Sequence, residues 1–207
     1  MSKKLLPLRP LSQLFPKPMV MGCEGVCAAM LLQYNQQQIS PTHIMKYWPK
    51  HQNDPRQGYV GHQLIVKIGY HQTIFPQAFV PYLKRYNEAI QDGSGKSLED
   101  LETLIERGQP VLIYNTVLGQ KPQRKSFNFD GQKYTVTSNI HTTVLIGYDD
   151  DYYYYIDPLW SQWLKHTLTL PALFPSHHQI IRIAKSTLEE SYDAPGRMCI
   201  YINKNRS

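Results

Sequence analysis

The order of apolar and polar residues predicts helices in the first half of the chain. Residues 23–34 are almost wholly apolar at helical spacing, which indicates a buried helix. Ser40 before Pro41 predicts the start of a short second helix. Residues 77–91 place apolar side chains on one helical face, and residues 97–107 begin with N-capping residues and end at a glycine.

Strand patterns dominate the second half. Residues 111–117 form a near-continuous apolar run, which is typical of a buried central strand. Residues 143–146 and 152–156 flank an acidic turn and predict a β-hairpin. We expect a further strand over residues 162–170 and a last one over residues 198–202. Helices followed by antiparallel strands indicate an α+β fold.

Three segments show neither the helical nor the strand spacing of apolar residues and are expected to be irregular. Residues 5–18 contain four prolines and predict an extended lead-in. Residues 49–63 predict a long loop whose glycines allow close approach of the backbone. Residues 119–133 are polar and include a turn signal at Asp130-Gly131.

Composition limits the classes of protein that the chain can belong to. The 207 residues are 42% hydrophobic and 18% charged, which suits one globular domain over residues 1–207. The net charge is +6, but the densest basic run, at residues 121–125, has no aromatic platform, so we expect no nucleic-acid partner. The sequence does not indicate an oligomeric state.

Cysteine usage and the N-terminal sequence bear on the compartment. Three cysteines are an odd number and do not make a disulfide framework, which suits a reducing compartment. No segment is long and apolar enough to span a bilayer, and no signal peptide is evident. We therefore expect a cytoplasmic protein, or an exported one if a leader has been removed.

Cys23 stands at the predicted start of the first helix and is the leading candidate for a nucleophile. Unpaired backbone N–H groups and the positive end of the helix dipole favour a thiolate there, and thiolate is the reactive form. The alternative is a small buried hydrophobic residue, a common role for cysteine in apolar stretches. That structural role is the better interpretation for Cys27, one turn further along, and for Cys199.

A histidine and an aspartate bracket the predicted hairpin. With the turn centred on Asp149 or Asp150, His141 lies opposite Asp157 or within a residue or two of it. The carboxylate could then orient the imidazole and stabilise its charged form. An ordinary surface pair at a hairpin end is the alternative interpretation. Together, a helix-start cysteine, a strand histidine and a downstream acid are the parts of a cysteine hydrolase.

At these residues the chain resembles the bacteriocin-processing cysteine peptidases and their stand-alone relatives, a papain-like group. The resemblance covers most of residues 8–160. It is carried by four motifs, which are Gly22-Cys23-Glu24 before the apolar helix, His141 to Asp149, Asp157-Pro158, and the loop Asp54 to Gly61.

The resemblance implies a papain-like fold in which a helical half carrying Cys23 packs on an antiparallel sheet carrying His141 and Asp157. It also implies a peptidase that acts on a peptide or protein substrate through an acyl-enzyme. The family places an oxyanion-hole glutamine upstream of the nucleophile, and Gln13 is the matching residue here, at a somewhat longer spacing. Relatives in transporters cut leader peptides after Gly-Gly.

We expect no metal and no cofactor, because the histidines show no close metal-ligand spacing except at His177-His178, and such adjacent pairs are usually incidental. Two other functions remain open. The same triad could serve an acyltransferase or amidase, or the scaffold could be a catalytically inactive binding domain. Residues 59–75 and 119–133 are expected to line or cover the cleft.

Overall fold

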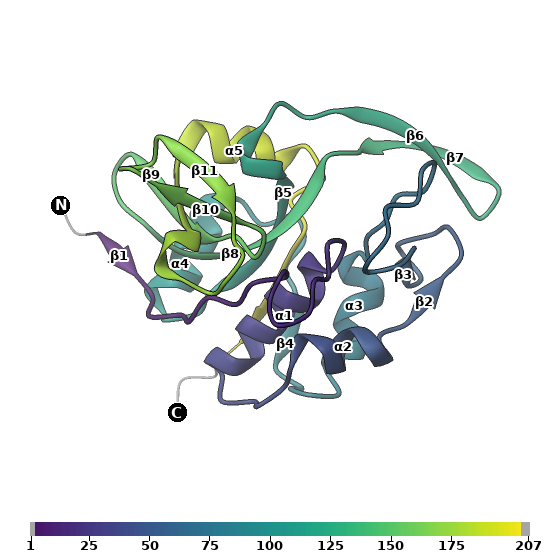
Figure 1. Cartoon of the computed structure of the whole chain (residues 1–207), viewed down its shortest axis with the longest axis horizontal. Coiled ribbons are helices and arrows are strands. Elements are labelled where there is room, and N and C mark those ends of the chain that lie inside the picture. Colours follow the sequence, from purple (N-terminus) through teal and green to yellow (C-terminus); the bar gives the residue numbers. More distant parts are fainter. Residues whose placement is uncertain (1–2, 204–207) are drawn as a thin grey trace.

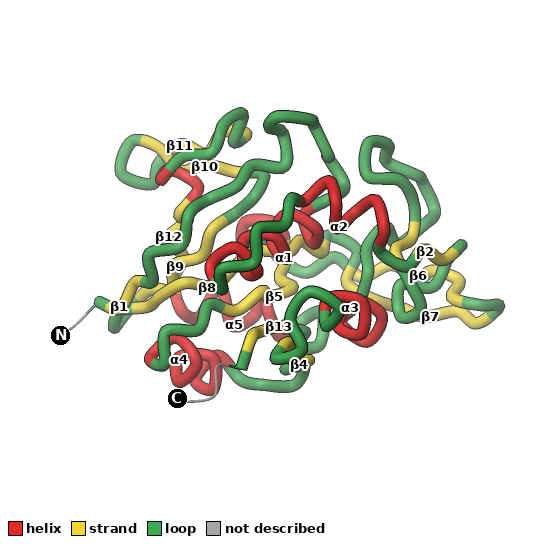
Figure 2. The backbone as a smooth tube through the Cα atoms, turned by 90° about the horizontal axis from the view of Figure 1, so that it is seen from below, coloured by secondary structure: helices red, strands yellow, loops and turns green. Residues whose placement is uncertain are grey.

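The computed structural model describes residues 3–203 and shows an antiparallel sheet with helices packed around it (Figure 1). Figure 2, turned by a right angle, shows α1 (Cys23–Tyr34) and α2 (Pro41–Tyr47) above β5 (Val111–Thr116) and β13 (Cys199–Ile202). The hairpin of β6 (Arg124–Phe129) and β7 (Gln132–Thr137) reaches away at one end. None of the helices in this described part is long and apolar enough to cross a membrane. The helices are α1 (Cys23–Tyr34), α2 (Pro41–Tyr47), α3 (Pro76–Leu83), α4 (Leu98–Glu106) and α5 (Lys185–Asp193), with 3-10 turns at Val117–Gly119 and His177–Gln179.

The main sheet has seven strands in the order β12-β9-β8-β5-β13-β4, and β1 pairs with the far end of β8. All of its pairs are antiparallel. Its strands are β1 (Lys4–Leu5), β4 (Ile90–Asp92), β5 (Val111–Thr116), β8 (Ile140–Tyr148), β9 (Tyr152–Ile156), β12 (Ile180–Ala184) and β13 (Cys199–Ile202).

Three small two-stranded sheets lie outside this main sheet. One is parallel, and the other two are antiparallel hairpins. Their strands are β2 (Lys50–His51) with β3 (Tyr59–Val60), β6 (Arg124–Phe129) with β7 (Gln132–Thr137), and β10 (Trp160–Trp163) with β11 (Leu168–Pro171).

The α1 helix lies in the core because its sequence leaves it no polar face. Its residues from Glu24 to Leu32 are all buried, and it packs against β8 and β5. The predicted helix over residues 23–34 is therefore confirmed residue for residue. Burial of a helix on all sides fixes its position through core packing rather than through helix propensity.

Helix starts follow the predicted capping chemistry. The Ser40 side chain accepts a hydrogen bond from the backbone N–H of His43 at 3.2 Å, which caps α2. Ser97 and Asp100 form a reciprocal capping box at the start of α4. Both contacts satisfy backbone donors that the first turn of a helix leaves unpaired.

The predicted helix over residues 77–91 was too long. The α3 helix ends at Leu83, and Ile90 belongs instead to edge strand β4. A polar turn intervenes, in which the Asn87 side chain accepts a hydrogen bond from the N–H of Ala89 at 3.0 Å. The apolar spacing continued across this turn because Ile90 is buried by the sheet, so periodicity alone did not mark the break.

One prediction of an irregular segment and one prediction of a strand were also wrong. The polar stretch 119–133 is not a loop, since most of it belongs to the β6–β7 hairpin around the predicted turn at Asp130 and Gly131. Residues 162–170 are not one strand, because the chain reverses between β10 and β11. Strand β6 is mostly polar and exposed, which is the composition of a loop, and the turn after Trp163 contains no glycine or proline to mark the reversal.

Candidate active site

Cys23 is the first residue of α1 and is half-buried. Glycines on either side allow α2 to approach it closely. A Cβ at Gly22 would lie 2.7 Å from the Met45 Sδ, and one at Gly25 would lie 2.5 Å from the Met45 Cγ. Met45 therefore packs directly on the turn that presents the sulfur.

His141, on β8, and Asp157, the residue after β9, form a buried pair. The Nε2 of His141 lies 2.8 Å from the Oδ1 of Asp157. The β8–β9 ladder is irregular between Leu145 and Gly147, so Val144 pairs with Ile156 and Asp157 lies just past the end of the ladder. Continuing this register places Asp157 opposite Thr143, two residues from His141, which is within the predicted range, and the contact runs diagonally across the ladder.

Asp157 is held in place by its own backbone environment. Its Oδ1 accepts hydrogen bonds from the N–H groups of Leu159 at 2.8 Å and Trp160 at 3.0 Å. The buried Gln179 side chain donates to the carbonyls of Leu11 and Asp157. These contacts fix the carboxylate, and through it the orientation of the imidazole ring.

Because Nε2 of His141 is engaged by Asp157, the other ring nitrogen is the one available to Cys23. Burial opposes a charged imidazole, but the Asp157 charge and hydrogen bond, together with Cys23, raise the pKa of His141 well above its usual value. Asp157 thus stabilises the imidazolium that forms when His141 accepts a proton from the Cys23 sulfur.

The thiol itself is not activated by its helix terminus alone. Burial, followed by the nearby Glu24 carboxyl, raises the pKa of Cys23, and the contact with His141 only partly offsets this. The sequence predicted thiolate from the helix dipole, and that effect is outweighed here. Removal of the thiol proton therefore depends on His141 as its acceptor.

Glu24 also belongs to this site, although the sequence indicated no role for it beyond its place in the Gly22-Cys23-Glu24 motif. Its buried carboxyl accepts a hydrogen bond from the Cys23 thiol at 3.3 Å, and also contacts the Thr73 hydroxyl and the Ile74 N–H. Burial raises the pKa of Glu24, while its hydrogen bonds lower it in part. An acid inside an otherwise apolar helix was the available signal, because buried carboxyls are rare unless paired.

Gln13 lies in the same pocket as Cys23 and His141. This pocket has a volume of about 230 Å³. The Gln13 side chain is buried and donates to the Val20 carbonyl at 2.8 Å, while its Oε1 lacks a partner within residues 3–203. A side-chain amide has two N–H groups, so one remains for an oxyanion.

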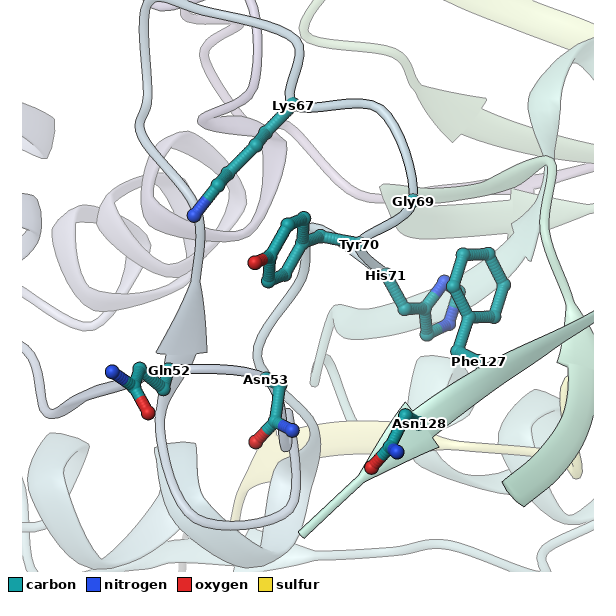
Figure 3. Close-up of a pocket in the computed structure, with 8 residues that line it drawn as sticks. All are labelled: Gln52, Asn53, Lys67, Gly69, Tyr70, His71, Phe127 and Asn128. Atoms are coloured by element: carbon teal, nitrogen blue, oxygen red, sulfur yellow. The ribbon is translucent and has the colours of Figure 1, made fainter. Parts of the chain in front are cut away.

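The pocket continues into a groove between the loop before Thr73 and the β6–β7 hairpin. Figure 3 shows the outer hollow of this groove, with the rings of His71 and Phe127 side by side. Their centroids are 4.9 Å apart, and burial lowers the pKa of His71 to about 4. The stack joins residues 59–75 to the hairpin, and both line the groove, as expected for these segments.

The other candidate residues lie elsewhere. The Cys27 thiol is buried and donates to the Thr142 carbonyl at 3.2 Å, and Cys199 is buried in β13, so both fit a structural role. All three cysteines are free thiols. The ring of His178 stacks on Trp163. The described residues contain no group of three or more His, Cys, Asp or Glu side chains that could hold a metal ion.

The fold is the papain-like α+β arrangement that the sequence predicted, with the helix carrying Cys23 packed on an antiparallel sheet. A family model matches residues 5–196, and the chain belongs to the peptidase C39-like family. The chain is 26% identical over 149 residues to the uncharacterized protein YvpB of Bacillus subtilis (strain 168), and the match covers 66% of this chain.

The match also covers 58% of YvpB, so the chain spans little more than half of the length of that relative. A crystal structure of a candidate C39-like peptidase from Bacillus anthracis superposes with a TM-score of 0.82. That likeness covers 100% of both chains at 22% sequence identity, and at this identity it concerns the fold.

Proposed function

We propose that the chain is a cysteine peptidase that cleaves a peptide bond through Cys23, His141 and Asp157 by way of an acyl-enzyme. One observation carries the proposal. The sulfur, the imidazole and an oxyanion donor candidate, Gln13, line a single pocket, and a buried aspartate holds the imidazole. Membership of a peptidase-like family supports the same chemistry.

The mechanism follows from the proton balance of the site. His141 accepts the Cys23 proton as the sulfur attacks the carbonyl carbon of the substrate, and Asp157 stabilises the resulting imidazolium. The N–H of Cys23 and the amide of Gln13 receive the developing oxyanion. His141 then protonates the leaving amine, and the acyl-enzyme is hydrolysed when the same ring deprotonates a water molecule.

A peptide vinyl sulfone tests the proposal, with the adduct located by mass spectrometry. We expect one adduct, on Cys23, and its loss in Cys23→Ala. In His141→Ala the labelling rate should fall about a hundredfold or more, because the general base is removed. Labelling of Cys27 or Cys199 instead, or equal rates in the His141 variant, would refute the assignment.

Turnover separates peptidase activity from the other uses of the triad. A mixture of peptides should yield new termini that require Cys23, and an added amine acceptor should not increase product formation. Products that carry the added amine would indicate acyl transfer. A catalytically inactive binding domain would cleave no peptide, and its Cys23 would react with iodoacetamide at pH 6 no faster than free cysteine does.

A further inference from the structure

A cluster of exposed apolar side chains covers the β10–β11 hairpin and the loop after it, and none of these side chains lines the pocket of Cys23. Leu164 at the tip of the hairpin is 71% exposed, and Leu173 and Phe174 in the loop are 61% and 65% exposed. We call this cluster the hairpin face, and its members are Phe15, Trp163, Leu164, Leu168, Leu170, Leu173 and Phe174.

The register of the hairpin turns its apolar side away from the main sheet. Trp163 pairs with Leu168, and Leu170 lies two residues further along on the same side. The opposite side carries Gln162, whose Oε1 accepts a hydrogen bond from the N–H of Arg182 on β12 at 2.9 Å. A polar residue therefore faces the sheet while apolar residues face outward, the reverse of the usual pattern.

The loop before α1 extends the same surface. The rings of Phe15 and Phe174 lie 5.4 Å apart, and the Ser12 hydroxyl donates to the Ala172 carbonyl. A hollow of about 430 Å³ lies on the hairpin side of this contact, lined mostly by apolar side chains. Contiguous exposed apolar surface of this kind marks an interaction site in a soluble protein.

The charge around the hairpin face identifies the kind of partner. Residues 11–20 and residues 158–176, which supply this surface, contain no aspartate and no glutamate. They do contain exposed Lys17 and Lys165, and Arg182 lies beside the hairpin. A second copy of the chain would place like charges opposite one another, which disfavours self-association through this face.

We propose that the hairpin face binds the surface of an anionic lipid bilayer. The apolar side chains at the hairpin tip and in the following loop insert at the headgroup level, Trp163 lies at the interface, and Lys17 and Lys165 contact the anionic headgroups. The Phe15 loop begins at Gln13, which lines the candidate active-site pocket. Binding through this face would bring that pocket close to the membrane surface.

Sedimentation with vesicles tests the proposal on the full chain. Vesicles of phosphatidylcholine with phosphatidylglycerol should bind the protein, and vesicles of phosphatidylcholine alone should bind it far more weakly. Leu173→Ser with Phe174→Ser should weaken binding about tenfold or more, because apolar burial is lost. Lys17→Glu with Lys165→Glu should weaken it by a similar factor, and added salt should mimic that effect.

Two exposed residues of another loop give a matched control. Ile65 and Ile68 are 63% and 95% exposed, and their double change to serine should leave vesicle binding unchanged.

Trp163 supplies a second measurement that needs no destabilising variant. Its fluorescence should shift to shorter wavelength on anionic vesicles and be quenched by brominated lipid, and Trp163→Phe should abolish both signals.

Three results would overturn the proposal. One is no binding to anionic vesicles, which would leave an acidic protein as the partner of this face. Another is an equal loss of binding in the Ile65 and Ile68 control. The third is a concentration-dependent dimer in sedimentation velocity that the Leu173 and Phe174 changes dissociate. None of these results bears on the proposed peptidase chemistry, which is tested by labelling of Cys23.

Discussion

Replacing Asp157 with asparagine separates the charge of this side chain from its geometry. The amide oxygen can still accept from Leu159, Trp160 and His141, as Oδ1 does now. The amide nitrogen takes the position of Oδ2, which lacks a partner within the described residues. The turn should therefore remain intact while the negative charge next to the imidazole disappears.

The size of the effect follows from the 2.8 Å contact between His141 and Asp157. At an effective dielectric constant of about 20, the gross attraction between unit charges at this distance is about 6 kcal/mol. Burial of the imidazolium opposes much of it, and pairs of this kind usually shift a pKa by about 1 to 3 units. We expect the pKa of His141 to fall by that amount in Asp157→Asn, and kcat/KM to fall by roughly ten- to a thousandfold.

An NMR titration of the imidazole signals measures this pKa directly, with His141 assigned by comparison with His141→Gln. Steady-state cleavage of a peptide substrate supplies kcat/KM. Asp54→Asn is the matched control, because Asp54 is also a buried carboxylate but is paired with Arg56 outside the pocket. An unchanged His141 pKa together with unchanged kcat/KM would refute the role given to Asp157.

Three further predictions concern other groups. Gln13→Ala should lower kcat roughly a hundred- to a thousandfold with little change in KM, measured by steady-state kinetics, and a change confined to KM would contradict the oxyanion role. Glu24→Gln should lower the pKa of Cys23, because the nearby carboxyl charge is removed. The rate of reaction of Cys23 with iodoacetamide at pH 7 should then rise by up to about tenfold per pKa unit. An unchanged rate would show that burial alone raises that pKa. The hydrogen bonds from Arg56 lower the pKa of Asp54 from 3.8 to about 2, so this carboxylate stabilises the fold above pH 4. About 2 kcal/mol of that stability should be lost as the pH falls from 4 towards 2, and urea unfolding should show no such loss in Asp54→Asn.

The sequence was most informative where burial is complete. The α1 helix and strand β5 are wholly or almost wholly buried, and both were predicted within about one residue. The β6–β7 hairpin was missed because strand β6 is mostly polar and exposed, which is the composition of a loop. The β10–β11 hairpin was merged into one strand because its turn, from Leu164 to His166, has positive φ angles without a glycine, proline or asparagine to mark it.

The site could be predicted only in part for a related reason. The pairing of His141 with Asp157 is local, since one hairpin brings them together, and the sequence predicted it to within about two residues. The approach of Cys23 to that pair depends on how α1 packs against the sheet, and no local pattern encodes this. The link from Glu24 to Thr73 joins segments 49 residues apart and was equally invisible.

The close packing of Met45 against Gly22 and Gly25 has a consequence for how this protein can vary. The Met45 side chain fills the space beside both glycines, next to the residue that carries the sulfur. A methyl group added to either glycine must therefore displace Met45, and where that buried side chain cannot move aside, α2 or the first turn of α1 must shift. A substitution at either glycine is therefore expected to change both the stability of the fold and the reactivity of Cys23.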